Sequence, residues 1–273
     1  MAGFEGRFER LELKYVIDEF TADQIRSSIE PYCRPDAHNR ESKGHAELGS
    51  HDHPGYGVRS LYLDSPALAL FRAKERGDAE RIKLRVRTYT DSLSDPVLEI
   101  KRRISDVVSK TRASVDRSNV EGVARGCFPA TSDPEMQHFL NDFALTSTRL
   151  GAQPTLWVCY DREAYTSDVN TYARVTFDRQ IVARRTHDWS FDAGSYEDWC
   201  RFDDHRSPDL RTKNVVLELK CDSFIPNWIT NLIQTHALKR QSFSKYGVGI
   251  YLTGLRFAEA SLPRRSAKAL AWV

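Results

Sequence analysis

The chain has 273 residues, of which 40% are hydrophobic, and it carries 40 Lys and Arg residues against 38 Asp and Glu residues. This length is enough for one large domain or two small ones. The net charge of +2 excludes a protein that binds nucleic acid through a uniformly basic surface. Five scattered cysteines without a CxxC pair argue against disulfides and a zinc site. No apolar run resembles a signal peptide or a membrane span, so we expect a soluble, cytoplasmic protein.

Alternating strand and helix patterns follow one another along the whole chain. Strands are predicted at 7–17, 58–64, 80–90, 96–104, 107–116, 154–165, 172–185 and 214–221. Helices are predicted at 21–31, 65–76, 226–236 and 243–257. A capping box at Thr21 and Gln24 is expected to open the first helix. Residues 35–56, rich in His, Gly and Ser, predict a flexible loop, and 118–148 a helical insertion broken at Pro129 and Pro134.

The most informative predicted strand reads Arg-Ile-Lys-Leu-Arg-Val-Arg-Thr-Tyr from Arg81 to Tyr89. A strand places its four cations on one face and its aliphatic residues on the other. Cations two residues apart lie roughly 7 Å from each other, and each pair costs about 2 kcal/mol at an effective dielectric constant of about 20. Either a row of carboxylates or a bound polyanion must offset this repulsion.

Several other predicted strands alternate charged and aliphatic residues in the same way. If the charged positions share one interior, its cations are residues 10, 14, 81, 83, 85, 87, 101, 103, 110, 112, 174 and 220. The carboxylates at 12, 99, 178 and 218 are far fewer. Ordinary solvated strand faces are the alternative interpretation, but they usually mix Thr, Ser, Gln and Lys instead of repeating Arg. The excess of cations therefore favours a bound polyanion, and Glu99 is expected to orient neighbouring guanidinium groups.

About eight long antiparallel strands with a polar face predict an α+β fold, in which a closed antiparallel β-barrel carries helices on its outside. Closure is expected because it removes exposed strand edges. The sequence contains no internal repeat and no clear interdomain linker. We therefore expect a single domain over residues 1–273, with the flexible loop at 35–56 and the helical insertion at 118–148.

The ordered set of charged motifs resembles the VTC (vacuolar transporter chaperone) domain, the polyphosphate polymerase family of the triphosphate tunnel metalloenzyme fold. No single motif is specific, but together they follow the family's order from residue 10 to residue 246. The motifs begin at Arg10, Arg59, Ile82, Leu98, Tyr160, Arg174, Leu217 and Ser242.

The resemblance implies a polymerase that transfers the γ-phosphate of ATP onto a growing inorganic polyphosphate chain inside a basic tunnel, with Mn²⁺ or Mg²⁺. The implied catalytic and phosphate-binding residues are Lys14, Arg85, Arg87, Lys101, Arg103, Arg162, Arg174 and Lys245. Lys83, Lys220 and Ser244 would add substrate contacts, and Glu218 matches the metal-binding glutamate. The implied partners are ATP and polyphosphate rather than nucleic acid, and any coupling to transport would need a separate membrane partner.

Two positions depart from the patterns of related proteins. The wider tunnel superfamily often opens with Glu-x-Glu-x-Lys, and Arg10 replaces its first glutamate, which favours the polymerase branch over two-metal triphosphate hydrolases. Ser242 stands where the polymerase can carry another lysine. A tunnel triphosphatase that hydrolyses tripolyphosphate or a nucleoside triphosphate remains an alternative, as does a non-catalytic polyphosphate-binding module.

Overall fold

The computed structural model describes residues 11–39, 54–89, 95–105, 107–169, 172–191, 199–202, 215–222 and 224–255. Contacts between Cα atoms divide the chain into two compact units, each assembled from segments far apart in the sequence. Among the described residues, the first unit draws on 59–158 and 184–191, and the second unit on 11–58, 159–183 and 199–255. The single domain over residues 1–273 stays a prediction. Arg10 and residues 40–53 of the predicted loop lie outside the described ranges.

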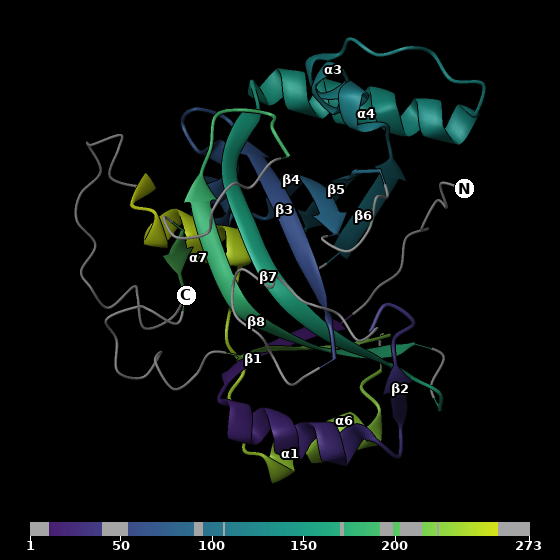
Figure 1. Ribbon diagram of the computed structural model, residues 1–273, viewed down its shortest axis with the longest axis vertical. Helices are drawn as coiled ribbons and strands as arrows, with labels where there is room; N and C mark the ends of the chain where they lie inside the picture. The colour runs from purple at the N-terminus through teal and green to yellow at the C-terminus, as the bar shows by residue number, and fades with distance from the viewer. Residues whose placement is uncertain are drawn as a thin grey trace. The chain divides into compact units, whose positions relative to one another are not determined.

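Ten strands, drawn as arrows in Figure 1, make up the sheet in the described part of the chain. They are β1 (Leu11–Ile17), β2 (Cys33–Pro35), β3 (Tyr56–Asp64), β4 (Glu80–Tyr89), β5 (Val97–Ile104), β6 (Val107–Ser114), β7 (Gln153–Ser167), β8 (Ala173–Arg185), β9 (Cys200–Arg201) and β10 (Val215–Cys221). All eight strands predicted from the sequence are present. The sequence pattern does not predict β2 and β9, because two or three residues are too few to show a period.

The strand order is β1-β10-β8-β7-β3-β4-β5-β6, with β2 on β7 and β9 on β8. Every register described between neighbouring strands is antiparallel. The predicted antiparallel α+β class is therefore confirmed. The order of the described strands ends at β1 and β6 and does not close on itself, so the barrel stays a prediction.

Seven helical segments accompany these strands in the described ranges. They are α1 (Glu19–Ile29), α2 (Ala69–Arg76), η2 (Arg117–Asn119), α3 (Val120–Arg125), α4 (Pro134–Leu150), α6 (Asn227–Thr235) and α7 (Lys245–Leu252). The insertion predicted at 118–148 consists of η2, α3 and α4, and α4 begins at one of the two prolines that mark the predicted break. None of the helices in the described residues combines the length and the hydrophobicity needed to cross a membrane.

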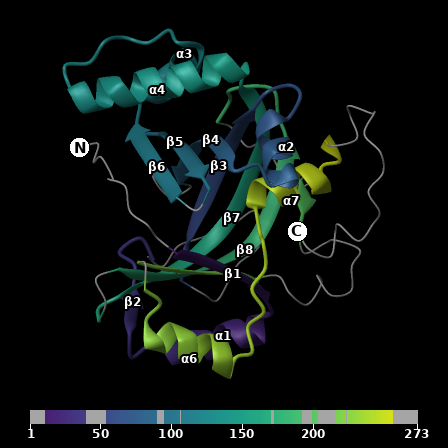
Figure 2. The same ribbon diagram turned by 180° about the vertical axis from the view of Figure 1, so that it is seen from behind.

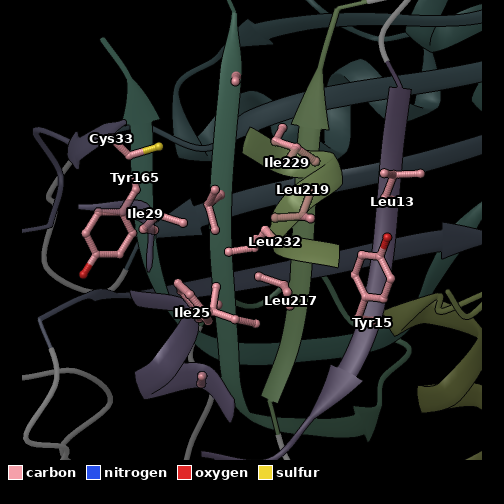
Figure 3. Close-up of a cluster of buried hydrophobic side chains, with 14 of the residues drawn as sticks. Leu13, Tyr15, Ile25, Ile29, Cys33, Tyr165, Leu217, Leu219, Ile229 and Leu232 are labelled. Carbon is pink, nitrogen blue, oxygen red and sulfur yellow. The ribbon is translucent and has the colours of Figure 1, made fainter. Parts of the chain in front are cut away.

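An apolar face of the second unit packs against α1 and α6, as Figure 3 shows in close-up. Alternate residues of β1 and β10 point to this face, since a strand has a period of two. The strand side chains of the cluster include Leu13, Tyr15, Tyr165, Leu217 and Leu219, and the helix side chains Ile25, Ile29, Ile229 and Leu232. The charged residues between these strand positions therefore lie on the opposite face of the same strands.

The first helix begins differently from the sequence prediction. Asp18 is the N-cap residue, and its carboxylate accepts a hydrogen bond of 2.7 Å from the backbone N–H of Thr21. The capping box predicted at Thr21 and Gln24 is wrong, because Thr21 already lies in the first turn. An aspartate at this place both satisfies a free N–H and carries negative charge at the positive end of the helix dipole.

The aliphatic face of β4 and β5 forms the core of the first unit. Its buried side chains are Leu84, Val86, Leu98 and Ile100. Arg102 continues this face toward α4, and its guanidinium donates to both carboxylate oxygens of Asp142 at 2.8 and 2.9 Å. This bidentate pair connects α4 to β5. In Figures 1 and 2, α3 and α4 lie side by side.

We predict that Asp18→Ala lowers the free energy of unfolding by about 1 kcal/mol, because the helix loses its N-cap. Urea denaturation followed by circular dichroism measures this loss. Thr21→Ala is the matched control and should have a clearly smaller effect. A larger loss in Thr21→Ala than in Asp18→Ala would contradict the assignment of the cap.

Candidate functional site

The predicted site residues fall into two groups, one in each unit. In the second unit, the Glu218 cluster consists of Lys14, Tyr160, Arg162, Asp178, Glu218, Lys220 and Lys245. In the first unit, the basic face of β4, β5 and β6 carries Lys83, Arg85, Arg87, Glu99, Lys101, Lys110 and Arg112.

Glu218 lies at the centre of its cluster and is only 4% exposed. Strand register places it between Lys14 of β1 and Thr176 of β8, and directly paired residues of antiparallel strands share one face. Its Oε1 lies 3.1 Å from Lys14 Nζ and 3.4 Å from Lys245 Nζ. Its Oε2 lies 3.1 Å from Lys220 Nζ. One buried carboxylate therefore holds three ammonium groups together.

Asp178 is a second buried carboxylate, for which the sequence indicated no specific role. Arg162 donates to its two oxygens from Nε and Nη2, at 2.6 and 2.7 Å. The ammonium group of Lys245 lies 2.5 Å from Oδ2 of the same aspartate. The positions of Arg162 and Lys245 are thus fixed by Asp178 as well as by Glu218. The alternation of charge in the strand from residue 174 to 178 is the signal that places Asp178 on the charged face.

Tyr160 is also missed as a site residue by sequence reasoning. Its ring centroid lies 4.7 Å from the Lys245 ammonium and 5.3 Å from the guanidinium carbon of Arg162. Both distances suit cation–π attraction. The position of Tyr160 two residues before Arg162 in β7 is the only sequence signal, because this spacing puts both side chains on one face.

The local structure at Lys245 explains how a lysine comes to lie at 8% exposure. Ser244 is the N-cap of α7, and its hydroxyl accepts a hydrogen bond of 3.2 Å from the backbone N–H of Gly247. Lys245 is the first residue of the helix. The substrate contact expected of Ser244 stays a prediction, and its hydroxyl is engaged in capping.

Opposite charges in the Glu218 cluster shift one another's pKa values. Burial opposes ionisation of Glu218, but Lys14, Lys220 and Lys245 outweigh it and hold the pKa of this carboxyl well below its usual range. Burial also opposes the charge of Lys14, yet Glu218 and Glu12 raise its pKa. For Lys220, burial dominates and lowers the pKa despite the attraction of Glu218.

Arg174 belongs to the same sheet face but has partners of its own. Register pairs it with Lys220 of β10. Its Nη2 lies 2.8 Å from the Asp36 carboxylate and donates to the hydroxyl of Tyr56 at 3.3 Å. The structure therefore places Arg174 beside the Glu218 cluster, with its charge balanced by an acid that sequence reasoning did not single out.

The basic face of the first unit places cations directly opposite one another on neighbouring strands. The registers pair Lys83 with Lys101 and Lys101 with Lys110, so three lysines form a row across β4, β5 and β6. The next row contains Arg85, Glu99 and Arg112. Side chains paired in this way have Cβ atoms about 5 Å apart, so like charges at neighbouring positions repel each other.

Glu99 is the acidic residue among the paired positions of this face and is 3% exposed. Arg85 donates to it from Nε, Lys110 Nζ lies 2.8 Å away, and Arg87 Nη1 lies 3.8 Å away. The three cations, with Arg85 and Arg87 first, hold the pKa of Glu99 well below its usual range although burial opposes this. Glu99 thus orients a guanidinium group, in agreement with the role expected of it.

Arg103 is the predicted site residue that is least enclosed. It lies on the basic face, paired with Arg81, but at the exposed end of β5. Its Nε donates to the backbone carbonyl of Ser105 at 2.7 Å. Arg103 is therefore exposed, whereas Lys83, Arg85, Arg87 and Lys101 are half-buried.

The implied divalent cation can be tested against these residues. The described ranges contain no group of three or more His, Cys, Asp or Glu side chains that could hold a metal ion. The oxygens of Glu218 already contact several cations. Mg²⁺ in phosphoryl-transfer sites is commonly held by one or two carboxylates together with phosphate oxygens and water. The residues present therefore fit a metal that binds together with phosphates. Glu218 would supply one part of its coordination, and the phosphates and water would supply the rest.

Two solved structures resemble the chain at low identity. A protein from Vibrio parahaemolyticus, described provisionally as an adenylate cyclase, aligns with a TM-score of 0.44 at 12% identity, over 89% of this chain and 98% of that one. A protein from Pyrococcus horikoshii OT3 aligns with a TM-score of 0.41 at 10% identity, over 88% and 96%. At these scores neither likeness supports a conclusion about fold or function.

The sequence itself provides the family assignment. No curated protein matches the chain. The model of the VTC domain matches residues 9–253. This range contains the Glu218 cluster and the basic face of the first unit, together with every strand of the described sheet. Since the match covers nearly the whole chain, the protein belongs to the VTC domain family.

Proposed function

We propose that this protein is a metal-dependent polyphosphate polymerase that uses ATP. The observation that carries the proposal is the basic face of β4, β5 and β6, where lysines and arginines occupy directly paired positions on three neighbouring strands around Glu99. Such a face is suited to a polyanion, whose charge offsets the repulsion between the cations, and membership of the VTC domain family points to polyphosphate as that polyanion. The closed barrel expected from the sequence, with a tunnel through it, is part of this proposal.

In the proposed reaction, a terminal oxygen of the polyphosphate chain attacks the γ-phosphorus of ATP. The bond from that phosphorus to the bridging oxygen breaks, and ADP leaves with the electron pair. The attacking oxygen is already an anion at neutral pH, so no base has to remove a proton. Phosphoryl transfer of this kind needs positioning and neutralisation of charge more than covalent help from the protein.

The residues of the chain have distinct parts in this proposal. Arg85 and Arg87 present guanidinium forks that grip phosphate oxygens in two places. Lys14 and Lys245 supply ammonium groups whose positions Glu218 fixes. Mn²⁺ or Mg²⁺, when bound, would neutralise phosphate charge, with Glu218 as its protein ligand and phosphate oxygens completing its coordination.

We predict that purified protein with ATP and Mn²⁺ makes long-chain polyphosphate and an equimolar amount of ADP. Gel electrophoresis and phosphorus NMR resolve these products. Orthophosphate as the only phosphate product would replace the proposal with a triphosphatase. Tight polyphosphate binding without any turnover would replace it with a binding module.

We predict that Glu218→Gln abolishes turnover while polyphosphate binding is kept or becomes tighter. The change removes the metal ligand and one negative charge from a cluster of cations, and it is nearly isosteric. Activity assays and polyphosphate titrations measure the two effects. Glu12→Gln is the matched control, since Glu12 also pairs with Lys14, at 3.2 Å, but is partly exposed, and it should retain turnover.

Because a buried ion pair that loses one partner is destabilised by about 3–5 kcal/mol, thermal unfolding of Glu218→Gln must be followed in parallel. Polyphosphate should raise the unfolding temperature of this variant more than that of the wild type, because the ligand replaces the lost negative charge. Full activity in Glu218→Gln would refute the metal role.

We predict that Arg87→Ala weakens the affinity for tripolyphosphate by about 1.5–3 kcal/mol, which is about a 10- to 100-fold rise in Kd. Isothermal titration calorimetry measures this change. The control is Arg102→Ala, which removes an arginine from the opposite face of β5, where it pairs with Asp142. The control should lose stability but keep its affinity, and equal losses of affinity in both variants would contradict a specific role for the basic face.

A further inference from the structure

The row of lysines on the basic face of the first unit brings several ammonium groups into neighbouring positions. Lys83, Lys101 and Lys110 occupy directly paired positions on three neighbouring strands. Like charges placed directly opposite each other in a sheet are unfavourable. Part of this repulsion disappears when one of the groups releases its proton.

The surroundings of Lys110 single it out within the row. β4 contributes Lys83, Arg85 and Arg87 to this face, β5 contributes Glu99 and Lys101, and β6 itself contributes Arg112. The hydroxyl of Tyr62 from β3 reaches Arg85 at 3.5 Å. A carboxylate oxygen of Glu99 lies 2.8 Å from Lys110 Nζ. Glu99 also accepts a hydrogen bond from Arg85 and lies near Arg87, so Lys110 shares this acid with two guanidinium groups.

Chemistry decides which of these cations can lose its charge. An arginine keeps its proton at any working pH, whereas a lysine readily changes its protonation when it is buried. The side chain of Lys110 is only 29% exposed. Burial, followed by the repulsion of Arg85 and Arg87, lowers the pKa of Lys110 to about 7, although Glu99 acts in the opposite direction.

We propose that Lys110 is a further phosphate-binding residue of this face and that it takes up a proton from solvent when a phosphate chain binds. This inference rests on the proposed function, because the ligand is the polyphosphate that the polymerase would extend. The bound anion offsets the repulsion from Arg85 and Arg87 and so favours the ammonium form of Lys110. Proton uptake at Nζ is the only chemical change.

The sign of the resulting pH dependence follows from linkage. The free protein holds Lys110 with a pKa of about 7, and the bound anion raises this value toward the ordinary 10.5. Between the two values, the complex binds more protons than the free protein and ligand together. The affinity for polyphosphate therefore falls as the pH rises through this window, by at most about tenfold per pH unit for one proton.

The test compares wild type, Lys110→Arg and Lys74→Arg by isothermal titration calorimetry with sodium polyphosphate, without divalent metal. Lys74 lies on α2, where its ammonium group is 3.1 Å from Glu75, and it serves as the control lysine. Measurements at pH 8 in buffers of different ionisation enthalpy give the number of protons taken up on binding. The difference between variants removes the contribution of the ligand's own end groups. Wild type should take up a substantial fraction of one proton more than Lys110→Arg, because arginine is already charged.

The pH profile of Kd from pH 6 to pH 9 completes the experiment. The Kd of wild type should rise more steeply with pH than that of Lys110→Arg, and Lys74→Arg should behave as wild type. Lys110→Gln serves as a second variant, in case the arginine does not fit, and should bind more weakly at pH 7 with a profile as shallow as that of Lys110→Arg. Each variant is used only after its circular dichroism spectrum matches that of wild type.

The outcomes separate this inference from the function on which it rests. Equal proton uptake in wild type and Lys110→Arg, with polyphosphate bound by both, overturns the role of Lys110 and leaves the proposed function standing. A failure of wild type to bind polyphosphate at every pH tested overturns both.

Discussion

The crowding of positive charge onto one face of each set of strands is the constraint on which the rest of the structure depends. A strand has two faces, and the apolar face must pack on helices for the unit to fold. The other face is then left with lysines and arginines at positions about 5 Å apart. Their repulsion has to be offset either by carboxylates of the protein or by an anion from outside.

The two units meet this constraint in different ways. In the second unit, Glu218 and Asp178 are buried among the cations and each contacts more than one of them. These acids hold Lys14, Arg162 and Lys245 in fixed positions before any ligand binds, which is the kind of preorganisation that phosphoryl transfer requires. In the first unit, Glu99 contacts Arg85, Arg87 and Lys110, and these contacts join three neighbouring strands through one acid.

Buried acids have two separate roles within the second unit. Glu163 illustrates a purely structural one: it binds Arg26 of α1 and Arg179 of β8 at 2.6 and 2.7 Å and so ties a helix to the sheet. Glu218 instead gathers cations from strands and from the start of α7 on one face. Both acids are buried and both contact several cations, so what distinguishes Glu218 is that its cations come from the charged face of the strands and from the start of α7.

Much of the fold follows from local patterns. The period of two in Arg81 to Tyr89 and in the other charged strands predicts eight strands, their charged faces and the antiparallel class, because hydrophobic alternation is a local property. The order of the motifs also indicates the VTC domain family, which the match over residues 9–253 establishes. Local propensity was less informative at the first helix. Asp18 and Thr21 are both residue types found at N-caps, and in the structure the Asp18 carboxylate is the acceptor.

The sequence by itself therefore determined the eight longer strands, which face of the charged strands carries the charge, and that the charge has to be neutralised. Only the tertiary structure decided the partners. Asp178 meets Lys245, Arg174 meets Asp36, and Lys110 shares Glu99 with Arg85. These pairings join segments that are far apart or on different strands, and their geometry depends on strand register and on where α7 begins. The physical reason is that alternation along a strand selects a face, whereas the neighbour across that face is selected by packing of the whole unit.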